Sequence, residues 1–175
     1  MCHGCGLKRA NPRRLCADCA GVDRARVEHH VRDLLKPLVP PWSAADNVVL
    51  AKACGDKATR PDLAWLAPDR LVVAEIDEDS HIGKKSSCEV ARTDRLRWGT
   101  NCKGPLVLVR FNPDVCDTSD DDLTTRVQAL AKVIQDAINR PLESLDPILP
   151  NVKFMYYHSK AQHLVDAQME HATPL

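Results

Sequence analysis

An apolar segment crowded with carboxylates constrains this chain more than any other feature of its sequence. It spans residues 60–81 and reads RPDLAWLAPDRLVVAEIDEDSH. The pattern predicts two β-strands, 62–66 and 70–77, joined by a tight turn at residues 67–69. Carboxylates held close together repel one another and raise each other's pKa, so folding alone gives no reason to place them here. We therefore expect a hairpin whose acids serve a chemical purpose.

The alternation of side chains along a strand puts the acids on one face of this hairpin. Glu75 and Asp77 are two residues apart, so they point to the same side of the second strand as Val73. The other side takes the apolar residues Val72, Ala74 and Ile76. Asp62 begins the neighbouring strand, and three carboxylates that converge in this way favour Mg²⁺ or Mn²⁺, which prefer oxygen ligands. The alternative interpretation is a solvated strand end whose acids have no function.

Groups suited to proton transfer and to phosphate binding follow the hairpin. His81 lies four residues past the last acid of the second strand, where a histidine beside a metal-bound water can act as a general acid or base. Taken alone, it would more often be a surface residue. A helix is predicted over 87–98, and it carries Arg92 and Arg95 near one face, where arginine can clamp a phosphate. The alternative is an ordinary helical salt bridge, such as Glu89 with Arg92.

Paired cysteines mark residues 1–21 as a separate module. Two Cys-x2-Cys pairs stand ten residues apart, formed by Cys2, Cys5, Cys16 and Cys19. Four thiolates in this arrangement are the ligand set of a structural zinc site. Few large apolar residues surround them, so metal binding would have to supply the folding energy of the module. Free surface thiols are the alternative interpretation.

The same module is rich in basic residues, namely Lys8, Arg9, Arg13 and Arg14. The chain as a whole has 24 Lys and Arg residues against 24 Asp and Glu residues, which argues against a basic coat but not against a local basic patch. Positive charge binds the DNA backbone, so we expect the module to grip DNA. On composition alone, solubility explains the basic cluster equally well.

The remaining segments complete an α/β pattern. Apolar residues at helical spacing predict a first helix over 27–38, with Glu28 at the margin of the apolar stripe. Glu28 could point along the buried face or into solvent, and the two readings weigh about the same. A long helix with Ser119 as its N-cap is predicted near the C-terminal end. Further strands are predicted over 47–54, 105–111 and 151–157. The order α-β-β-β-α-β-α-β predicts a mixed sheet flanked by helices, and the tail after residue 159 is left unassigned.

These parts, taken in order, resemble the PD-(D/E)XK nuclease superfamily. The strand VVAEIDEDSH, the helix CEVARTDRL and the strand VLVRFNPD are similar to the very-short-patch-repair endonucleases and their homing-endonuclease relatives, over about residues 23–115. The matching positions are Glu28, Asp62, Glu75, Asp77 and His81. Where the superfamily has its lysine, this chain has Asp77, and Lys84 and Lys85 lie at a different spacing. The role of the base therefore passes to the histidine.

The resemblance implies both a fold and an activity. The fold would be a restriction-endonuclease-like αβββαβ core over residues 22–175, next to the zinc ribbon or knuckle. The activity would be hydrolysis of DNA with Mg²⁺ or Mn²⁺, in a homing or mobile-element nuclease. Cutting both strands with one small site would usually need a homodimer. A non-catalytic, zinc-containing nucleic-acid-binding module is the alternative function, and a metal-dependent hydrolase with another substrate is a third.

Composition bears on where the chain works. No apolar run is long enough to span a membrane, and the polar, cysteine-rich start is unlike a secretory signal. We therefore expect an intracellular protein, where disulfides are rare. Of the eight cysteines, four lie outside the zinc module: Cys54, Cys88, Cys102 and Cys116. Buried free thiols are expected there, and a second zinc site assembled in three dimensions stays open.

Overall fold

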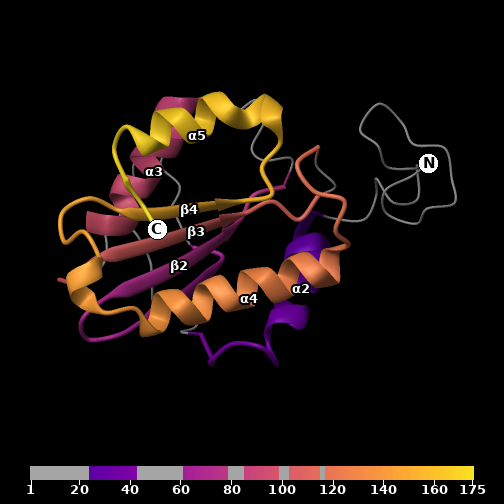
Figure 1. Ribbon diagram of the computed structural model, residues 1–175, viewed down its shortest axis with the longest axis horizontal. Coiled ribbons are helices and arrows are strands. Elements are labelled where there is room, and N and C mark those ends of the chain that lie inside the picture. The colour runs from indigo at the N-terminus through magenta and orange to yellow at the C-terminus, as the bar shows by residue number, and fades with distance from the viewer. Residues whose placement is uncertain (1–23, 43–60, 79–84, 99–102, 115–116) are drawn as a thin grey trace, which may run out of the picture.

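The computed structural model describes residues 24–42, 61–78, 85–98, 103–114 and 117–175. They form a five-stranded mixed sheet with helices against both of its faces (Figure 1). This architecture confirms the predicted α/β class. Several predicted features lie outside the described residues: the zinc module of residues 1–21, the strand 47–54 and His81.

The strands follow one another across the sheet in the order of the sequence. They are β1 (Leu63–Leu66), β2 (Leu71–Ile76), β3 (Leu106–Phe111), β4 (Asn151–Met155) and β5 (Thr173–Pro174). β1 is antiparallel to β2, and the other three pairings are parallel. The predicted hairpin is therefore confirmed. β4 ends before the predicted residue 157 because Tyr156 adopts a φ of 59°, in the left-handed region that a strand cannot use.

Within the described ranges, four α-helices cover the sheet: α2 (Arg24–Leu35), α3 (Ser86–Trp98), α4 (Leu123–Asn139) and α5 (Gln162–Met169). Two short 3₁₀ turns, η3 (Leu142–Ser144) and η4 (Ser159–Ala161), flank β4. Figure 1 shows α3 and α5 on one side of the sheet, with α4 and α2 on the other. The first three helices confirm the prediction, whereas α5 and β5 come from the tail that was left unassigned. None of the described helices is long and apolar enough to cross a membrane.

The predicted N-cap of α4 is wrong by three residues. The cap is Asp122, whose side chain accepts a hydrogen bond from the backbone N–H of Thr125 at 2.7 Å. Ser119 instead accepts from the backbone N–H of Asp121 at 3.1 Å. Serine and aspartate can both cap a helix or close a tight turn. Here the serine closes the turn that leads to the helix, and the last acid of the run caps it.

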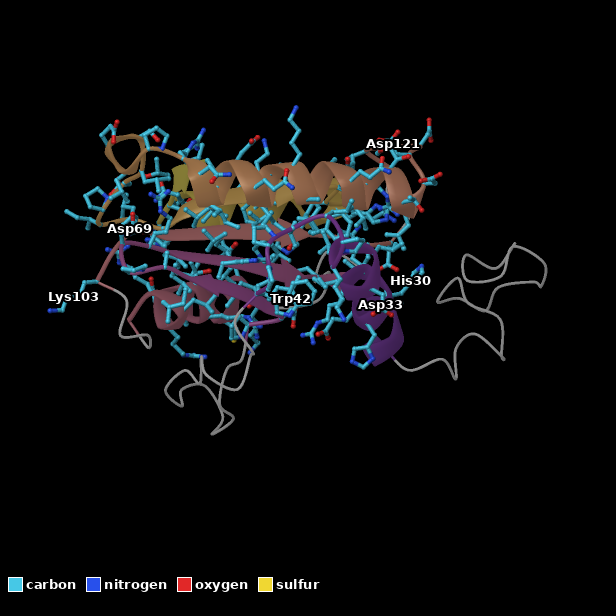
Figure 2. All side chains as sticks on the ribbon, turned by 90° about the horizontal axis from the view of Figure 1, so that it is seen from below. His30, Asp33, Trp42, Asp69, Lys103 and Asp121 are labelled. Carbon is cyan, nitrogen blue, oxygen red and sulfur yellow. The ribbon has the colours of Figure 1, made fainter. Side chains whose placement is uncertain are left out.

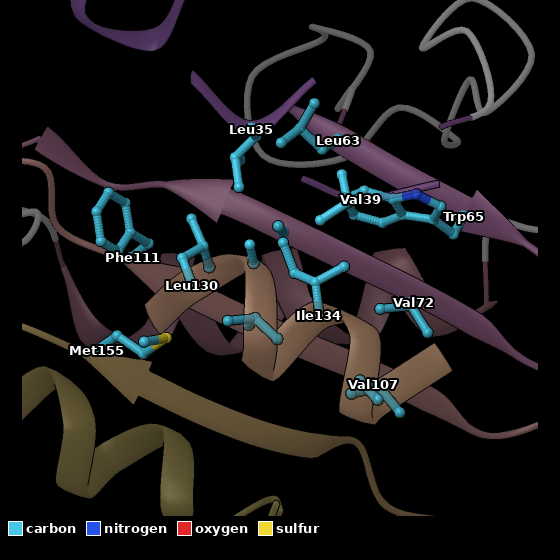
Figure 3. Packing of buried hydrophobic residues seen from close by; sticks show 14 of the residues in the cluster. Leu35, Val39, Leu63, Trp65, Val72, Val107, Phe111, Leu130, Ile134 and Met155 are labelled. Carbon is cyan, nitrogen blue, oxygen red and sulfur yellow. The ribbon is translucent and has the colours of Figure 1, made fainter. Parts of the chain in front are cut away.

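The sheet is buried on both faces, so it divides the core in two. All six residues of β2 and all six of β3 are buried. On the side of α2 and α4, Leu130 and Ile134 pack towards Val72 and Val107 (Figure 3). On the other side, Leu71, Val73, Leu106 and Leu108 pack with Leu96 of α3. Each such aliphatic side chain stabilises the fold by about 1.5–3 kcal/mol when it is fully buried. A charged side chain at a buried position of β2 brings no such gain, so its presence there needs a separate explanation.

The turn between β1 and β2 packs against the backbone that leads into β3. A Cβ atom added to Gly104 would lie 1.7 Å from the carbonyl oxygen of Asp69, so only glycine fits there. Figure 2 shows Asp69 and Lys103 at one end of the molecule and Asp121 at the other. The acids of β2 lie towards the second end, where the parallel strands finish. In open α/β sheets this carboxyl edge is where ligands bind.

Candidate active site

Asp62 and Glu75 are neighbours across the β1–β2 hairpin. Leu63 pairs with Ala74 in the antiparallel register, so Asp62, one residue earlier, lies beside Glu75. The carboxylate of Asp62 accepts a hydrogen bond from the backbone N–H of Ile76 at 2.7 Å, which holds it against the end of β2. The hairpin thus brings together two acids that lie on either side of its turn.

Helix α2 brings a third acid close to this pair. Arg32 forms an ion pair with Glu28 one turn earlier, and it donates to the backbone carbonyl of Asp62 at 2.6 Å. The charge of Glu28 also contributes to a raised pKa at Asp62. Glu28 keeps 28% of its side chain exposed, so it lies near the acids without being buried among them.

Burial and mutual repulsion perturb both hairpin carboxyls. Burial raises the pKa of Asp62 to about 6, and the charges of Glu28 and Asp77 add to the effect, while the hydrogen bond from Ile76 opposes it. Burial also raises the pKa of Glu75 to about 8, with the charge of Asp62 as the next cause. Two acids whose charged forms are disfavoured in one place are typical of a functional site, although structural ion pairs can perturb a pKa as well.

Glu75 is buried in the sheet but only half satisfied. Its side chain is 2% exposed, and one carboxylate oxygen, Oε2, pairs with the guanidinium of Arg92 from α3. The other oxygen, Oε1, is buried and has no hydrogen-bond partner among the described residues. A buried polar atom left unpaired costs about 1–3 kcal/mol. Such an atom marks the place where a cation or a proton would be stabilised.

Asp77 lies in a different environment, although it shares the face of Glu75. Its Oδ2 accepts from Nε of Arg110 at 2.6 Å and also from the hydroxyl of Tyr157. Arg110 reaches on to Glu89 of α3, at 2.6 Å. Burial would lower the pKa of Arg110, but the attraction of Asp77 and Glu89 raises it well above its usual value. Asp77, Arg110, Glu89 and Tyr157 thus form a buried network, called the Asp77 network below.

Helix α3 supports both the pair of Asp62 with Glu75 and the Asp77 network. It sends Glu89 to Arg110 and Arg92 to Glu75, one helical turn apart. The buried side chain of Gln168 from α5 holds this stretch of α3, because its amide donates to the Glu89 carbonyl at 3.1 Å and to the Thr93 hydroxyl at 3.0 Å. The site is therefore built from the β1–β2 hairpin, α2, α3, β3 and the residues that follow β4, with α5 as an indirect support.

The other predicted site residues have mixed outcomes. Arg95 lies half-buried on α3. Cys88, expected to be a buried thiol, is exposed and free, because it lies on the outer side of the first turn of α3. Lys85, the near neighbour of the superfamily's lysine position, is exposed just before α3. Other residues lie outside the described part of the chain: His81, Lys84, the zinc ligands Cys2, Cys5, Cys16 and Cys19, the basic residues Lys8, Arg9, Arg13 and Arg14, and the thiols Cys54, Cys102 and Cys116.

The three acids predicted to converge do not form a ready-made metal cage. Within the described ranges, no three His, Cys, Asp or Glu side chains are grouped so that they could hold a metal ion. Asp62 and Glu75 are a pair, while Asp77 is directed to Arg110 and Tyr157. No sequence pattern pointed to Tyr157, but Arg110 stands out as the one charged residue in the apolar strand PLVLVRF.

Comparison with known proteins adds no relative. No family model, no curated protein and no solved structure matches this chain. The chemistry of Asp62, Glu75 and their neighbours is therefore the basis for any assignment of function.

Proposed function

We propose that the protein is a metal-dependent DNA endonuclease that hydrolyses phosphodiester bonds on a restriction-endonuclease-like core. The observation that supports this most is the pair of half-buried Asp62 and buried Glu75, two carboxyls with raised pKa values that lie beside each other across a hairpin. A divalent cation would relieve their repulsion. Oxygen-only ligands favour Mg²⁺ or Mn²⁺.

The residues present fit such a cation. Asp62 and Glu75 would hold it, and the buried Oε1 of Glu75, which lacks a hydrogen-bond partner among the described residues, is the oxygen with capacity to spare. Glu28 adds negative charge close by. A cation bound there would supply a water of lowered pKa and would stabilise negative charge on the phosphate.

Residues on α3, together with His81, would complete the reaction. Arg92 keeps 29% of its side chain exposed, and a guanidinium matches the oxygens of a phosphate, so we assign it and Arg95 to the phosphate. We assign proton transfer to His81 on the strength of the family resemblance. In the same proposal, zinc is bound by Cys2, Cys5, Cys16 and Cys19, and DNA is gripped by the basic residues between them.

A second function is favoured by one specific observation. Glu75 of β2 is paired with Arg92, and Asp77, directly after β2, is paired with Arg110, so both buried carboxylates already have a counter-ion within the protein. A fold whose buried negative charges are neutralised by arginines in this way can be stable without a bound cation. The second candidate is therefore a nucleic-acid-binding module that has a nuclease-like fold but no catalysis.

Cleavage of supercoiled plasmid DNA separates the two functions. The wild-type protein is compared with Asp62→Asn, which keeps an oxygen to accept from Ile76 but loses the charge. Asp33→Asn is the matched control, since Asp33 is exposed on α2 (Figure 2). We expect the wild type and the control to cut with Mg²⁺ or Mn²⁺, and expect EDTA or Asp62→Asn to abolish cutting. Gel-shift binding without any cutting, by the wild type with either metal, would support the binding module instead.

A further inference from the structure

We propose that Asp77 is a positioning residue, which fixes Arg110 and the end of β2 and leaves the cation to Asp62 and Glu75. This inference rests on the proposed metal-dependent function. It changes the role of one of the three acids on the hairpin face, and it gives Arg110, Tyr157 and Glu89 a part in the site.

The Oδ2 oxygen of Asp77 already has two donors within the protein, whereas the Oε2 oxygen of Glu75 has one, Arg92; Oδ1 of Asp77, like Oε1 of Glu75, is a buried oxygen that accepts no hydrogen bond from the described residues. Asp77 is 1% exposed and Arg110 3%, and the distance between Oδ2 and Nε is 2.6 Å. The hydroxyl of Tyr157 donates to the same oxygen. Removing one partner of a buried ion pair is strongly destabilising, because it leaves a charge without compensation. A cation at Oδ2 would compete with both donors and would approach a guanidinium of like charge.

The register of the sheet shows what this engagement achieves. Arg110 is the β3 residue opposite Glu75 of β2, so its guanidinium starts from the position nearest to Glu75. It nevertheless donates to Asp77 on one side and to Glu89 on the other. We assign to the Asp77 network the role of keeping Arg110 from donating to Glu75, so that the buried Oε1 of Glu75 is left without a hydrogen-bond donor among the described residues.

The backbone of Asp77 serves the same purpose. Its N–H donates to the carbonyl of Phe111 at 2.8 Å, so the pairing of β2 with β3 continues one residue beyond Ile76. Both the side chain and the main chain of Asp77 therefore tie the end of β2 to β3. Glu75 lies two residues before this anchor, and its carboxylate is oriented by it.

Asparagine and alanine at position 77 distinguish positioning from direct binding. The Asp77→Asn side chain would keep a carbonyl oxygen that accepts from Arg110 and Tyr157, and Arg110 would keep Glu89 as a counter-ion. Alanine keeps no acceptor. Binding of Mn²⁺ alone, without DNA, is measured from the electron paramagnetic resonance signal of the free ion. Thermal unfolding of each variant reports whether it is folded.

We expect Asp77→Asn to bind Mn²⁺ within about tenfold of the wild type and Asp77→Ala to bind about 10- to 100-fold more weakly, as for residues that orient a metal ligand. Asp62→Asn should weaken Mn²⁺ binding by more than this 10- to 100-fold range. Tyr157→Phe removes only one hydroxyl and serves if the substitutions of Asp77 prevent folding. Since Tyr157 acts through Asp77, Tyr157→Phe should weaken Mn²⁺ binding by about tenfold.

Two results would overturn the inference, and they differ in what they leave standing. If Asp77→Asn loses Mn²⁺ as completely as Asp62→Asn, or if Tyr157→Phe binds Mn²⁺ as well as the wild type or better, Asp77 is a direct ligand. The proposed nuclease function would then remain. If the wild-type protein itself binds no Mn²⁺, the proposed function fails and the role of Asp77 fails with it.

Discussion

Arg110 stands opposite Glu75 in the register of the central strands, yet its Nε donates to Asp77 at 2.6 Å. One guanidinium thereby compensates two buried acids, Asp77 and Glu89, and leaves a third with Arg92. The site can be viewed as two units on one face of β2. In one, Arg110 pairs with both Asp77 and Glu89; in the other, Arg92 offsets only part of the repulsion between Asp62 and Glu75, whose pKa values stay raised. The predictions below separate what each unit does.

The first prediction concerns the dependence of stability on pH in EDTA. The native pKa of Glu75 is about 8 and that of Asp62 about 6, both above their usual values of 4.5 and 3.8. Between the usual and native values, the folded protein binds more protons than the unfolded chain. Stability is therefore fully present at low pH and is lost as the pH rises from about 4 to 8, by a few kcal/mol in all.

Urea denaturation at about pH 5, 7 and 8.5 measures this loss across the window in which the two acids ionise. Glu75→Gln should flatten the dependence and be more stable than the wild type at the highest pH, because its side chain never ionises. Asp33→Asn should keep the wild-type slope. A wild-type protein whose stability is level over the whole range would show that neither burial nor repulsion raises the pKa of the two acids in the folded state.

The second prediction concerns proton transfer. His81→Ala should lower the rate of DNA cleavage by about 10² to 10⁴, the usual cost of losing a general acid or base, without loss of DNA binding. Lys85 is exposed and lies closest to the superfamily's lysine among the described residues, so Lys85→Ala is the matched variant. Single-turnover rates on the plasmid give the comparison. If His81→Ala cleaves DNA at the wild-type rate and Lys85→Ala does not cleave it, Lys85 and not His81 is the general acid or base.

The third prediction concerns zinc. The purified protein should carry about one Zn²⁺ per chain, bound by Cys2, Cys5, Cys16 and Cys19. Cys16→Ser should lose the metal and weaken DNA binding, while the thermal unfolding of the sheet changes little. Cys88→Ser is the control, since this thiol is exposed and free. Metal analysis that finds no zinc in freshly prepared wild-type protein would remove the zinc module from the account.

The fourth prediction separates the observed N-cap of α4 from the predicted one. Asp122→Ala removes the acceptor of the Thr125 N–H and should cost about 0.5–2 kcal/mol of the free energy of unfolding. Ser119→Ala removes a turn contact at an exposed position and should cost less, within about 0.5 kcal/mol. Denaturant titration of both variants decides the matter. The reverse order would restore Ser119 as the cap.

The accuracy of the sequence prediction follows the distance over which residues interact. The hairpin is short and local, so the turn at 67–69 and the alternation of β2 predicted both the strands and the faces of Glu75 and Asp77. The partners of Asp77 could not be predicted, because Arg110 and Tyr157 lie 33 and 80 residues further along the chain. No pattern in a single sequence reports such a contact.

The remaining misses have local causes. The run SDDD offers several residues able to cap α4, and composition alone does not choose among them. Helix α5 has only eight residues, too short for a clear period of apolar residues. Its contact with α3 through Gln168 therefore came only from the structure.

The clamp of Gln168 on α3 has a consequence for the order of events during synthesis. A ribosome releases β1, β2 and α3 well before Tyr157, which follows β4, and Gln168 of α5. Asp77 would therefore lack the Tyr157 hydroxyl, and α3 would lack its contact with Gln168, while the chain is still growing. In the proposed enzyme this would be a built-in delay, which keeps a nascent nuclease from cutting before its translation has passed α5.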